Sequence, residues 1–573
     1  MQSSLFLVLR RIRAPLILLI VIYAVSITGL VFIPGADGEG NPIRMDFLHA
    51  FYFISYTATT IGFGEIPYAF TPAQRLWVTF CIYLTVIGWS YAFVKVLALV
   101  QDRWFLHAIE VQRFKNQVKR LTEPFYLICG YGETGSMLCR AFDSLGRRFV
   151  VLDRDEYRIA ELDLADYRAD TPALVADAKS PESLVLAGLK HPRCTAVLAL
   201  TNDDRTNLAI ATAGRLLRPD LPLICRAENP QIAADMRLFD AANVIEPFDK
   251  IGEYLALAIR SPGSYQLLQW LTGIPGTTLG EQTEPPSGRW VVCGDGYFAG
   301  SIARKLRERG LEVGIIEKPG PGRPNESLPL APSPPTAGLS GLLQPSELER
   351  SVGLVAGTDD DSFNLSIVAT ARKLNPALFF VLRQNLRANQ MLFEAHESDI
   401  SVVSQEIVVH ECLAHLTTPL LSRFLQIIKS RDDAWADATV HKLRSKVTRQ
   451  VPLLWTVDLS PSGAPACGDF CRRADEELRL DHLLRDPGNR ESYLPCVALL
   501  VARRDRDIEM PGPELRLGST DRLLFAGTPD AKARQSLTLA NVNVLDYVYL
   551  GRDVPRGWIW GKLFSSPKAH RSR

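Results

Sequence analysis

The sequence predicts a helical membrane region followed by two α/β domains, each built on a doubly wound parallel sheet, and a small α+β lobe near the C-terminus. Three observations predict this arrangement. Two long uncharged stretches lie within the first hundred of the 573 residues. From about residue 125, strand-like runs alternate with helix-like segments. The same alternating pattern then recurs further along the chain, which indicates a duplicated domain.

The expected parts follow one another in order: membrane region 1–101, linker 102–123, first α/β domain 124–280, second α/β domain 288–445, C-terminal lobe 446–552 and basic tail 553–573. The chain has 64 basic and 63 acidic residues, a net charge of +1, so nothing in its charge favours a nucleic-acid partner. Its ten cysteines include no Cys-x-x-Cys pair, which is typical of reduced, structural thiols.

The membrane region contains two candidate spans. No charge occurs from Ala14 to Ala36, and the apolar stretch Pro15–Ile33 would form a helix about 28 Å long, close to the roughly 30 Å of a bilayer core. Leu76–Val94 is the second uncharged stretch. Between them, Asp46–Ala58 is apolar but too short to cross, which predicts a re-entrant helix.

The flanking charges predict the orientation of these spans. The first span is preceded by the basic residues Arg10, Arg11 and Arg13. The second span is followed by Arg103, Arg113, Lys115, Lys119 and Arg120. The loop between the spans is mainly acidic, with Asp37, Glu39 and Asp46 and one basic residue, Arg44. The positive-inside rule therefore places both termini in the cytoplasm of a multi-pass protein of the cell membrane. A signal peptide is the alternative for the N-terminus, although no small-residue cleavage motif follows it.

The re-entrant helix leads into Thr60-Ile61-Gly62-Phe63-Gly64. Four copies of such a strand around one axis would point rings of backbone carbonyls inward, where they replace the hydration shell of K⁺. The glycines permit the alternating backbone conformations that this arrangement requires. The motif predicts a selectivity filter, with Thr60 adding a hydroxyl ring at its inner end.

This region resembles the two-transmembrane potassium channel family. The resemblance rests on Ala50-Phe51-Tyr52-Phe53 and on Thr59–Glu65. Two residues depart from the commoner pattern: Phe63 replaces Tyr, which removes a hydroxyl that braces the filter, and Glu65 replaces Asp. The resemblance implies a homotetramer in a lipid bilayer with K⁺ in the filter. A nonselective cation channel remains the alternative.

The second span contains two candidate gating residues. Gly88 lies mid-helix, where it would act either as a hinge or as a close-packing position for a neighbouring helix. Leu97 lies near the cytoplasmic end, where the inner helices of the resembled family converge. Four Leu97 side chains would close a pore by excluding water, unless they simply face lipid.

The first α/β domain opens with the strand-like run Phe125–Cys129 and then Gly130-Tyr131-Gly132-Glu133-Thr134-Gly135. Arg148–Asp153 is the next strand and ends in an acid. A G-x-G-x-x-G turn between a strand and a helix is typical of dinucleotide binding: the glycines permit the tight turn, the approach of the backbone to pyrophosphate, and close helix packing. The strand-end Asp153 would bind ribose hydroxyls.

Further strands are expected at 172–177, 195–201, 221–226 and 243–246, with helices near 250–272. The segment 125–275 resembles the RCK or KTN domain, a ligand-sensing module of potassium channels and transporters. The resemblance implies NAD or NADH as a regulatory ligand. It maps the nucleotide contacts onto Gly130, Gly132, Glu133, Thr134, Gly135, Asp153, Arg154, Asp177, Thr201, Asn202 and Arg226.

The second α/β domain repeats the first. Ala199–Leu208 aligns with Ala356–Leu365, with six of ten residues identical, and Arg226 aligns with Arg383 at the same spacing. Gly294-x-Gly296-x-x-Ala299 repeats the glycine motif. A proline-rich insert, about 318–340, replaces the helix and strand expected next. Nucleotide binding is therefore expected in the first copy more than in the second.

Beyond the repeat, Ser404–Arg431 is expected to form helices that cross to a neighbouring lobe. Strands are expected at 451–459 and 497–503. The segment 514–527 resembles the strand-turn-strand motif of the family's C-terminal lobe, with Leu515, Leu517, Leu523 and Phe525 facing its core. The basic tail is expected to be disordered.

The sequence gives weaker support for metal sites. His410 and His415 are five residues apart and share no helix face, and Cys467 and Cys471 lack a second ligand pair, so no zinc site is expected. The acids 203–204 and 359–361 would either bind Ca²⁺, which gates some channels of the family, or serve as helix caps.

The sequence as a whole predicts a ligand-gated potassium channel that is not an enzyme, gated by NAD or NADH on a ring of the α/β domains. Alternatives are a Ca²⁺-gated or nonselective channel, a membrane-anchored NAD-dependent oxidoreductase, and a scaffold with a dead pore.

Overall fold

The computed structural model describes residues 2–551 except 37–40, 66–68, 102, 240–242, 274, 277, 279–283, 318–342, 344, 397, 449, 472–476 and 505. The proline-rich insert and the basic tail thus lie outside the described residues. The chain forms two compact units, one reaching to Thr122 and one from Glu123 onward apart from the short stretches Pro172–Leu174 and Leu186–Gly188, and each unit is considered by itself.

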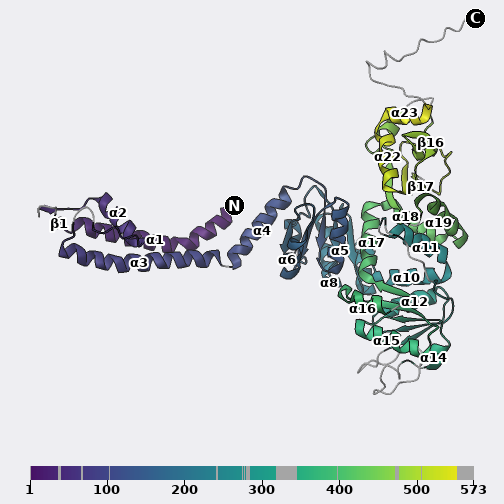
Figure 1. Cartoon of the computed structure of the whole chain (residues 1–573), viewed down its shortest axis with the longest axis horizontal. Helices are drawn as coiled ribbons and strands as arrows, with labels where there is room; N and C mark the ends of the chain where they lie inside the picture. Colours follow the sequence, from purple (N-terminus) through teal and green to yellow (C-terminus); the bar gives the residue numbers. More distant parts are fainter. Residues whose placement is uncertain are drawn as a thin grey trace, which may run out of the picture. The chain divides into compact units, whose positions relative to one another are not determined.

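The first unit is helical (Figure 1). It contains α1 (Gln2–Phe32), α2 (Phe47–Ala58), α3 (Pro72–Val100) and α4 (Arg103–Lys119), with a two-stranded antiparallel pair, β1 (Gly35–Ala36) and β2 (Pro42–Ile43). By length and composition, two helical stretches could cross a membrane: Arg13–Phe32 and Pro72–Ala98. The carboxylate of Asp46 caps α2 by accepting the amide of His49 at 2.9 Å.

The helices α1 and α3 pack side by side (Figure 1). A glycine allows the closest approach: a Cβ on Gly29 would lie 2.1 Å from the indole of Trp77. The same indole donates a hydrogen bond of 3.1 Å to the carbonyl of Ser26. Leu30, Ile54 and Cys81 are fully buried between the three helices. The short helix α2 is therefore held by the two long ones.

The second unit begins with a six-stranded sheet in the order β5-β4-β3-β6-β7-β8. Its strands are β3 (Phe125–Cys129), β4 (Arg148–Asp153), β5 (Ala173–Val175), β6 (Cys194–Ala199), β7 (Leu223–Arg226) and β8 (Asn243–Ile245). The strand β3 pairs in parallel with β4 and β6, so the chain reverses direction across the sheet at this point. Ligands of doubly wound folds bind at such a switch point.

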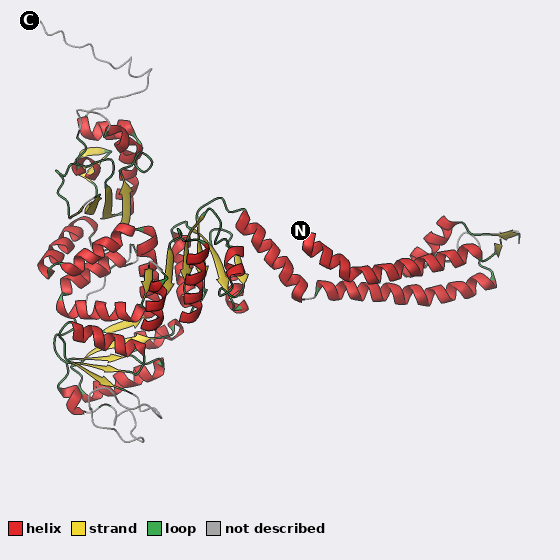
Figure 2. Cartoon of the chain, turned by 180° about the vertical axis from the view of Figure 1, so that it is seen from behind, coloured by secondary structure: helices red, strands yellow, loops and turns green. Residues whose placement is uncertain are grey.

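Helices cover this sheet: α5 (Glu133–Ser144), α6 (Glu156–Leu164), α7 (Pro181–Leu186), α8 (Asp204–Leu217) and α9 (Pro230–Leu238). The predicted Rossmann-like fold is confirmed, with each strand within a few residues of its expected bounds. Figure 2 shows the strands of this domain between layers of helix.

The second domain repeats this topology with five parallel strands in the order β10-β9-β11-β12-β13. They are β9 (Trp290–Cys293), β10 (Val313–Ile316), β11 (Gly353–Ala356), β12 (Phe379–Gln384) and β13 (Ile400–Val403). The helices are α12 (Tyr297–Glu308), α14 (Pro345–Glu349), α15 (Asp361–Leu374), η1 (Arg387–Asn389) and α16 (Gln390–Ala395). Among the described residues no strand corresponds to β5, and the insert falls at that place in the sequence.

Two helices follow the first sheet, α10 (Pro247–Arg260) and α11 (Pro262–Thr272), and three follow the second, α17 (Ser404–Thr417), α18 (Pro419–Ser430) and α19 (Asp433–Val447). The helix α10 packs on α12 and α17, and α17 also packs on α5 of the first domain. Trp270 and Phe424 are buried in a core that these helices share with the C-terminal lobe. This confirms that α17 and α18 cross between lobes.

The C-terminal lobe contains an antiparallel sheet in the order β14-β19-β17-β18. Its elements are β14 (Leu453–Asp458), β17 (Cys496–Arg503), β18 (Arg506–Glu509), β19 (Arg522–Gly527), the pair β15 (Arg485–Asp486) and β16 (Asn489–Tyr493), and the helices α20 (Pro465–Phe470), α21 (Leu480–Leu484), α22 (Pro529–Ala540) and α23 (Val542–Leu550).

The strand-turn-strand predicted at 514–527 is only half right. Its second arm is β19, but the first arm is a loop with one isolated bridge, between Arg516 and Arg479. The amide of Leu517 donates to Leu478, and the carbonyl of Leu515 accepts from Leu480, so this stretch bonds to a short segment rather than to a strand. The predicted core residues are nevertheless placed correctly, because Leu517, Leu523 and Phe525 are buried and Leu515 packs against them.

Candidate functional site

The loop after α2 has an alternating backbone. Thr60, Gly62 and Gly64 have φ values of +64°, +66° and +99°, whereas Ile61 and Phe63 between them do not have positive φ. Left-handed φ is strained for a residue with a side chain such as Thr60. This alternation is the geometry that turns successive carbonyls toward one side of an extended strand, as a ring of ion-coordinating carbonyls requires.

The loop is braced by α2. The hydroxyl of Tyr56 donates a hydrogen bond of 2.5 Å to the carbonyl of Gly64, and the amide of Ile61 donates 2.9 Å to the carbonyl of Tyr56. The ring of Phe63 lies edge-on to Tyr56 at 5.4 Å and parallel to Tyr52 at 6.5 Å. Tyr56 thus supplies a hydroxyl that braces the loop, whereas Phe63 has none. This role of Tyr56 was not predicted.

The C-terminal end of the loop is tied to α3 through Glu65. Its carboxylate accepts the Nε and Nη2 of Arg75 at 2.9 and 3.0 Å, and the amide of Phe70 at 2.8 Å. The pair is a two-point contact between a planar guanidinium and a carboxylate, which fixes orientation as well as distance. Glu65 therefore anchors the loop to Arg75 on α3 and to the amide of Phe70.

The candidate gating residues both lie on α3, which is continuous from Pro72 to Val100. A Cβ on Gly88 would come 2.3 Å from Cδ1 of Ile22 on α1, so Gly88 is a close-packing position in this structure. Leu97 is 46% exposed in the single chain. The hinge at Gly88 and the leucine ring at Leu97 stay predictions.

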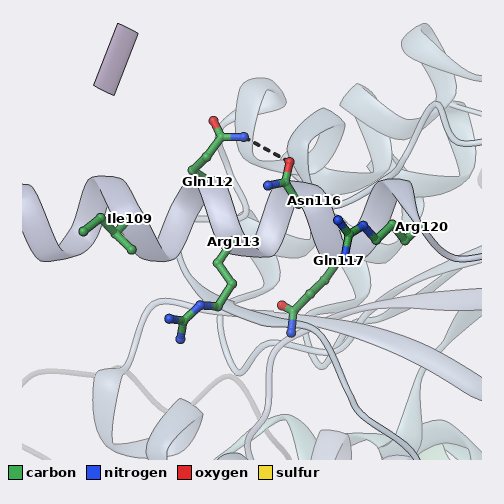
Figure 3. Close-up of a pocket in the computed structure, with 6 residues that line it drawn as sticks. All are labelled: Ile109, Gln112, Arg113, Asn116, Gln117 and Arg120. Atoms are coloured by element: carbon green, nitrogen blue, oxygen red, sulfur yellow. Dashed lines mark hydrogen bonds between the residues drawn. The ribbon is translucent and has the colours of Figure 1, made fainter. Parts of the chain in front are cut away.

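The linker helix α4 carries a shallow hollow of about 350 Å³. Figure 3 shows the residues that line it: Ile109, Gln112, Arg113, Asn116, Gln117 and Arg120, with a hydrogen bond of 3.1 Å from Gln112 to Asn116. All six belong to α4 and its end, so the hollow is one face of a helix and not an enclosed ligand site.

A second candidate site lies at the carboxyl end of β3, where the chain turns into α5. Gly130 has φ +105°, and a Cβ there would lie 2.9 Å from the amide nitrogen of Thr201. A Cβ on Gly135 would lie 2.0 Å from the carbonyl oxygen of Gly130. Both clashes are with backbone, so these two positions require glycine. Gly132 is the N-cap of α5 and offers no side chain to its first amides.

The strand-end acid Asp153 closes the other side of this turn. It is 7% exposed, and its carboxylate accepts the amides of Tyr131 at 2.6 Å and Asp155 at 2.9 Å. Asp153 thus holds the glycine turn to the end of β4 while each oxygen keeps a lone pair for a ligand. Arg154 is exposed, and Asp177 is exposed beyond β5, where it accepts the amide of Lys179.

Thr201, Asn202 and Arg226, the residues predicted for the inner rim of the nucleotide site, lie close together. Arg226 is 6% exposed and donates to Asn202 at 2.8 Å and to the carboxylate of Glu228. The buried amide of Asn207 joins this rim by bonding the hydroxyl of Thr201 at 2.7 Å and the carbonyl of Arg226 at 2.9 Å. Arg226 therefore ties β6 to β7, and its charge is already paired.

The same arrangement recurs in the second domain, which confirms the duplication. Asn364 bonds the hydroxyl of Thr358 at 2.7 Å and the carbonyl of Arg383 at 3.0 Å. Arg383 donates to Asp359 at 2.5 Å and lies 4.8 Å from the rings of both Phe248 and Phe298. The second copy thus places aromatic rings around the arginine at this rim.

Glu133 contacts the second domain. Its Oε1 accepts the amide of Arg387 at 3.2 Å, and its Oε2 is buried without a hydrogen-bond partner in the described chain. Glu133 is the first residue of α5, and Thr134 beside it is buried. The predicted nucleotide-binding turn therefore lies at the contact between the two α/β domains, which sequence spacing does not reveal because 254 residues separate the pair.

The acids considered for calcium serve as caps and anchors. Asp203 caps α8, and a 2.5 Å hydrogen bond from Thr206 together with Lys179 at 3.1 Å lowers its pKa to about 2. Asp204 accepts the amides of Glu228 and Asn229. In the second copy, Asp359 pairs with Arg383, Asp360 caps α15, and Asp361 accepts from Asn385, Leu386 and Asn389. Within the described ranges, no cluster of three or more His, Cys, Asp or Glu could hold a metal ion.

Two protein families match this chain. Residues 16–102 match the ion channel family, and residues 126–247 match the TrkA-N domain family. The chain joins an ion channel domain to a TrkA-N domain. The first covers the loop with alternating φ values, and the second covers the glycine turn and its rim.

Curated relatives carry related names. The chain is 26% identical over 227 residues to "Probable potassium channel protein 2" and 24% identical over 229 residues to "Potassium channel protein 1", both of Methanocaldococcus jannaschii. Each match covers 39% of this chain and slightly less than two thirds, 64% and 66%, of the relative. A "Putative K(+) efflux antiporter KefB" of Alkalimonas amylolytica is 28% identical over 155 residues, 26% of this chain and 22% of that protein. The ion channel and TrkA-N domains are therefore homologous to parts of potassium channel proteins.

Among solved structures, "GsuK Channel" covers 96% of this chain and 100% of its own, at 17% identity and a TM-score of 0.46. "GsuK channel bound to NAD" has the same coverages and identity and a TM-score of 0.43.

Proposed function

We propose that this chain is the subunit of a homotetrameric potassium channel of the cell membrane, gated by an adenine dinucleotide, NAD or NADH, bound to its TrkA-N domain. The observation that carries the proposal is the backbone of Thr60–Gly64, whose φ values alternate in sign within an ion channel domain. Such a backbone lines one side with carbonyl oxygens. Its likeness to proteins named as potassium channels supports K⁺ as the ion.

In this proposal four chains surround one axis, as closed rotational symmetry requires. The residues Thr60, Ile61, Gly62, Phe63 and Gly64 form the filter. Both termini and the two α/β domains lie on the cytoplasmic side. The α/β domains of the four chains form a ring, and the linker helix α4 transmits the conformation of this ring to α3. Gly88 and Leu97 on α3 are the candidate gating positions. The ligand shifts the gate only by its different affinity for the two states of the ring.

Nucleotide binding is supported by the geometry of the glycine turn. Gly130, Gly132 and Gly135 bring the backbone close to the N-terminus of α5, where the helix favours an anion. Asp153 lies beside the turn, where a carboxylate would accept ribose hydroxyls. Thr201 and Asn202 complete the rim.

The test is ion flux in liposomes that hold the purified full-length protein. The proposal expects K⁺ flux that changes when NAD⁺ or NADH is added on the cytoplasmic side. Gly132→Asp places a carboxylate where the phosphates would lie, so this variant should conduct but lose the nucleotide response. If wild type and variant respond alike, nucleotide gating through this turn is refuted.

The same preparation separates the alternative functions. Bi-ionic reversal potentials distinguish a potassium channel, which strongly prefers K⁺ over Na⁺, from a nonselective cation channel. Absence of any conductance would favour a scaffold. Conversion of NADH to NAD⁺ by the protein would favour an oxidoreductase. A response to Ca²⁺ without nucleotide would favour calcium gating, although the acids 203–204 and 359–361 are bonded to protein donors in this structure.

A further inference from the structure

The guanidinium of Arg158 lies over the glycine turn of the TrkA-N domain. Arg158 belongs to α6, the helix after β4. A Cβ built on Gly132 would come 2.7 Å from its Nη1. The space that the second glycine of the motif leaves open for pyrophosphate is therefore bordered by a cation of this chain.

Arg158 makes two long ion pairs and no close hydrogen bond among the described residues. Its nearest acids are Asp153, with 3.9 Å between Nη1 and Oδ2, and Asp155, with 3.7 Å between Nε and Oδ2. Both distances exceed that of a hydrogen bond. In the described chain its five N–H donors have no hydrogen-bond acceptor, and its side chain is 39% exposed. By contrast, Arg226 on the rim is buried and bonded to Asn202 and Glu228.

The charges around the turn favour such a cation as a partner for a bound anion. The carboxylates of Glu133, Asp153 and Asp155 all lie at this end of the sheet. The N-terminus of α5 contributes only the partial positive charge of the helix dipole, and Gly132 makes no side-chain hydrogen bond to its first amides. A phosphate beside three carboxylates would be repelled without a compensating guanidinium, and the planar fork of arginine matches phosphate oxygens in two-point contacts.

We propose that Arg158 binds the phosphate oxygens of the ligand at this turn. The ligand class is a nucleoside diphosphate or dinucleotide whose pyrophosphate lies between the amides of α5 and Arg158. On binding, the guanidinium exchanges its loose approach to Asp153 and Asp155 for direct phosphate contacts. This inference rests on the proposed nucleotide site and adds a residue that motif matching does not assign.

The experiment compares phosphorylated and unphosphorylated ligands. Binding of ADP, NAD⁺ and adenosine to the purified full-length protein is measured by isothermal titration calorimetry. The variants are Arg158→Gln, Arg158→Lys and the control Arg168→Gln. Arg168 is 72% exposed in the same domain and pairs only loosely with Asp143 at 3.9 Å.

The proposal expects Arg158→Gln to weaken ADP and NAD⁺ about tenfold to a hundredfold, as for the loss of charge-assisted hydrogen bonds, and to leave adenosine unchanged. Arg158→Lys should recover only part of the affinity, because an ammonium cannot form the two-point contact. Arg168→Gln should bind all three ligands as the wild type does.

Three results would overturn the inference. Wild-type affinity of Arg158→Gln for ADP would show that the guanidinium does not contact phosphate. An equal loss for adenosine and ADP would show that Arg158 only shapes the pocket. If the wild type binds none of the three ligands, the proposed nucleotide gating itself fails, and the inference fails with it.

Discussion

Tyr56→Phe is the most direct perturbation of the braced loop. The substitution keeps the ring that contacts Phe63 and removes only the hydroxyl that donates 2.5 Å to the carbonyl of Gly64. Tyr56 is 4% exposed, so water cannot easily replace the lost donor. The orientation of the Gly64 carbonyl then depends on the backbone alone.

The magnitude follows from the number of bonds. One such hydrogen bond contributes about 0.5–1.5 kcal/mol net, so a tetramer would lose about 2–6 kcal/mol of the stability of its conducting loop. Since about 1.4 kcal/mol is a factor of ten in an equilibrium constant, the occupancy of the conducting state relative to a collapsed one should fall more than tenfold. Sustained K⁺ current should therefore decay after activation.

The assay is single-channel recording in planar bilayers, with mean open time and steady-state open probability as readouts. Tyr52→Phe is the matched control, because Tyr52 lies parallel to Phe63 but its hydroxyl has no hydrogen-bond acceptor in the described chain. Size-exclusion chromatography confirms that each variant keeps its assembly. If Tyr56→Phe shows the open times of wild type and Tyr52→Phe, the hydroxyl does not brace the loop and the reasoning is refuted.

Three further predictions concern the α/β domains. Glu133→Gln keeps an acceptor for the amide of Arg387 but removes a negative charge beside the N-terminus of α5. Calorimetry should therefore show that the variant binds ADP about threefold to tenfold more tightly than the wild type does. Unchanged or weaker binding would contradict this prediction. Asn207→Ala removes a fully buried amide that ties β6 to β7 and should lower the free energy of unfolding in urea by about 2–4 kcal/mol, whereas a change below about 0.5 kcal/mol would contradict its role. The pKa of Asp203 is about 2 in the folded chain, against an ordinary value of 3.8, so its carboxylate stabilises the fold above pH 3.8 and loses this effect as the pH falls toward 2. Asp203→Asn should therefore reduce the fall in the free energy of unfolding between pH 3.8 and pH 2. An unchanged dependence on pH would refute this assignment.

Local patterns predicted the secondary structure well. The runs 125–129 and 148–153 are β3 and β4, because continuous apolar stretches bounded by Gly and Asp are typical of buried parallel strands. The internal repeat predicted a duplicated domain by aligning Ala199–Leu208 with Ala356–Leu365, and the aligned residues Asn207 and Asn364 make equivalent hydrogen bonds in the structure. The first arm of the strand-turn-strand predicted at 514–527 was wrong, because this stretch bonds to the short segment around Arg479 and not to a partner strand.

The candidate sites were predicted where a motif is local and missed where the chain folds back on itself. The glycines of both loops follow from spacing, since their backbone conformation is a local property. The hydroxyl of Tyr56 and the guanidinium of Arg158 reach their positions through helix orientation, which no spacing rule specifies. The contact of Glu133 with Arg387 depends on how two domains pack.

The central claim is a K⁺-conducting pore that responds to nucleotide. Potassium flux from liposomes holding the full-length protein, titrated with NAD⁺ and NADH on the cytoplasmic side, tests it most directly. The account predicts flux that exceeds protein-free liposomes, that prefers K⁺ over Na⁺, and that changes with nucleotide in wild type but not in Gly132→Asp. Flux that is indifferent to both nucleotides, or no flux in any condition, would contradict it.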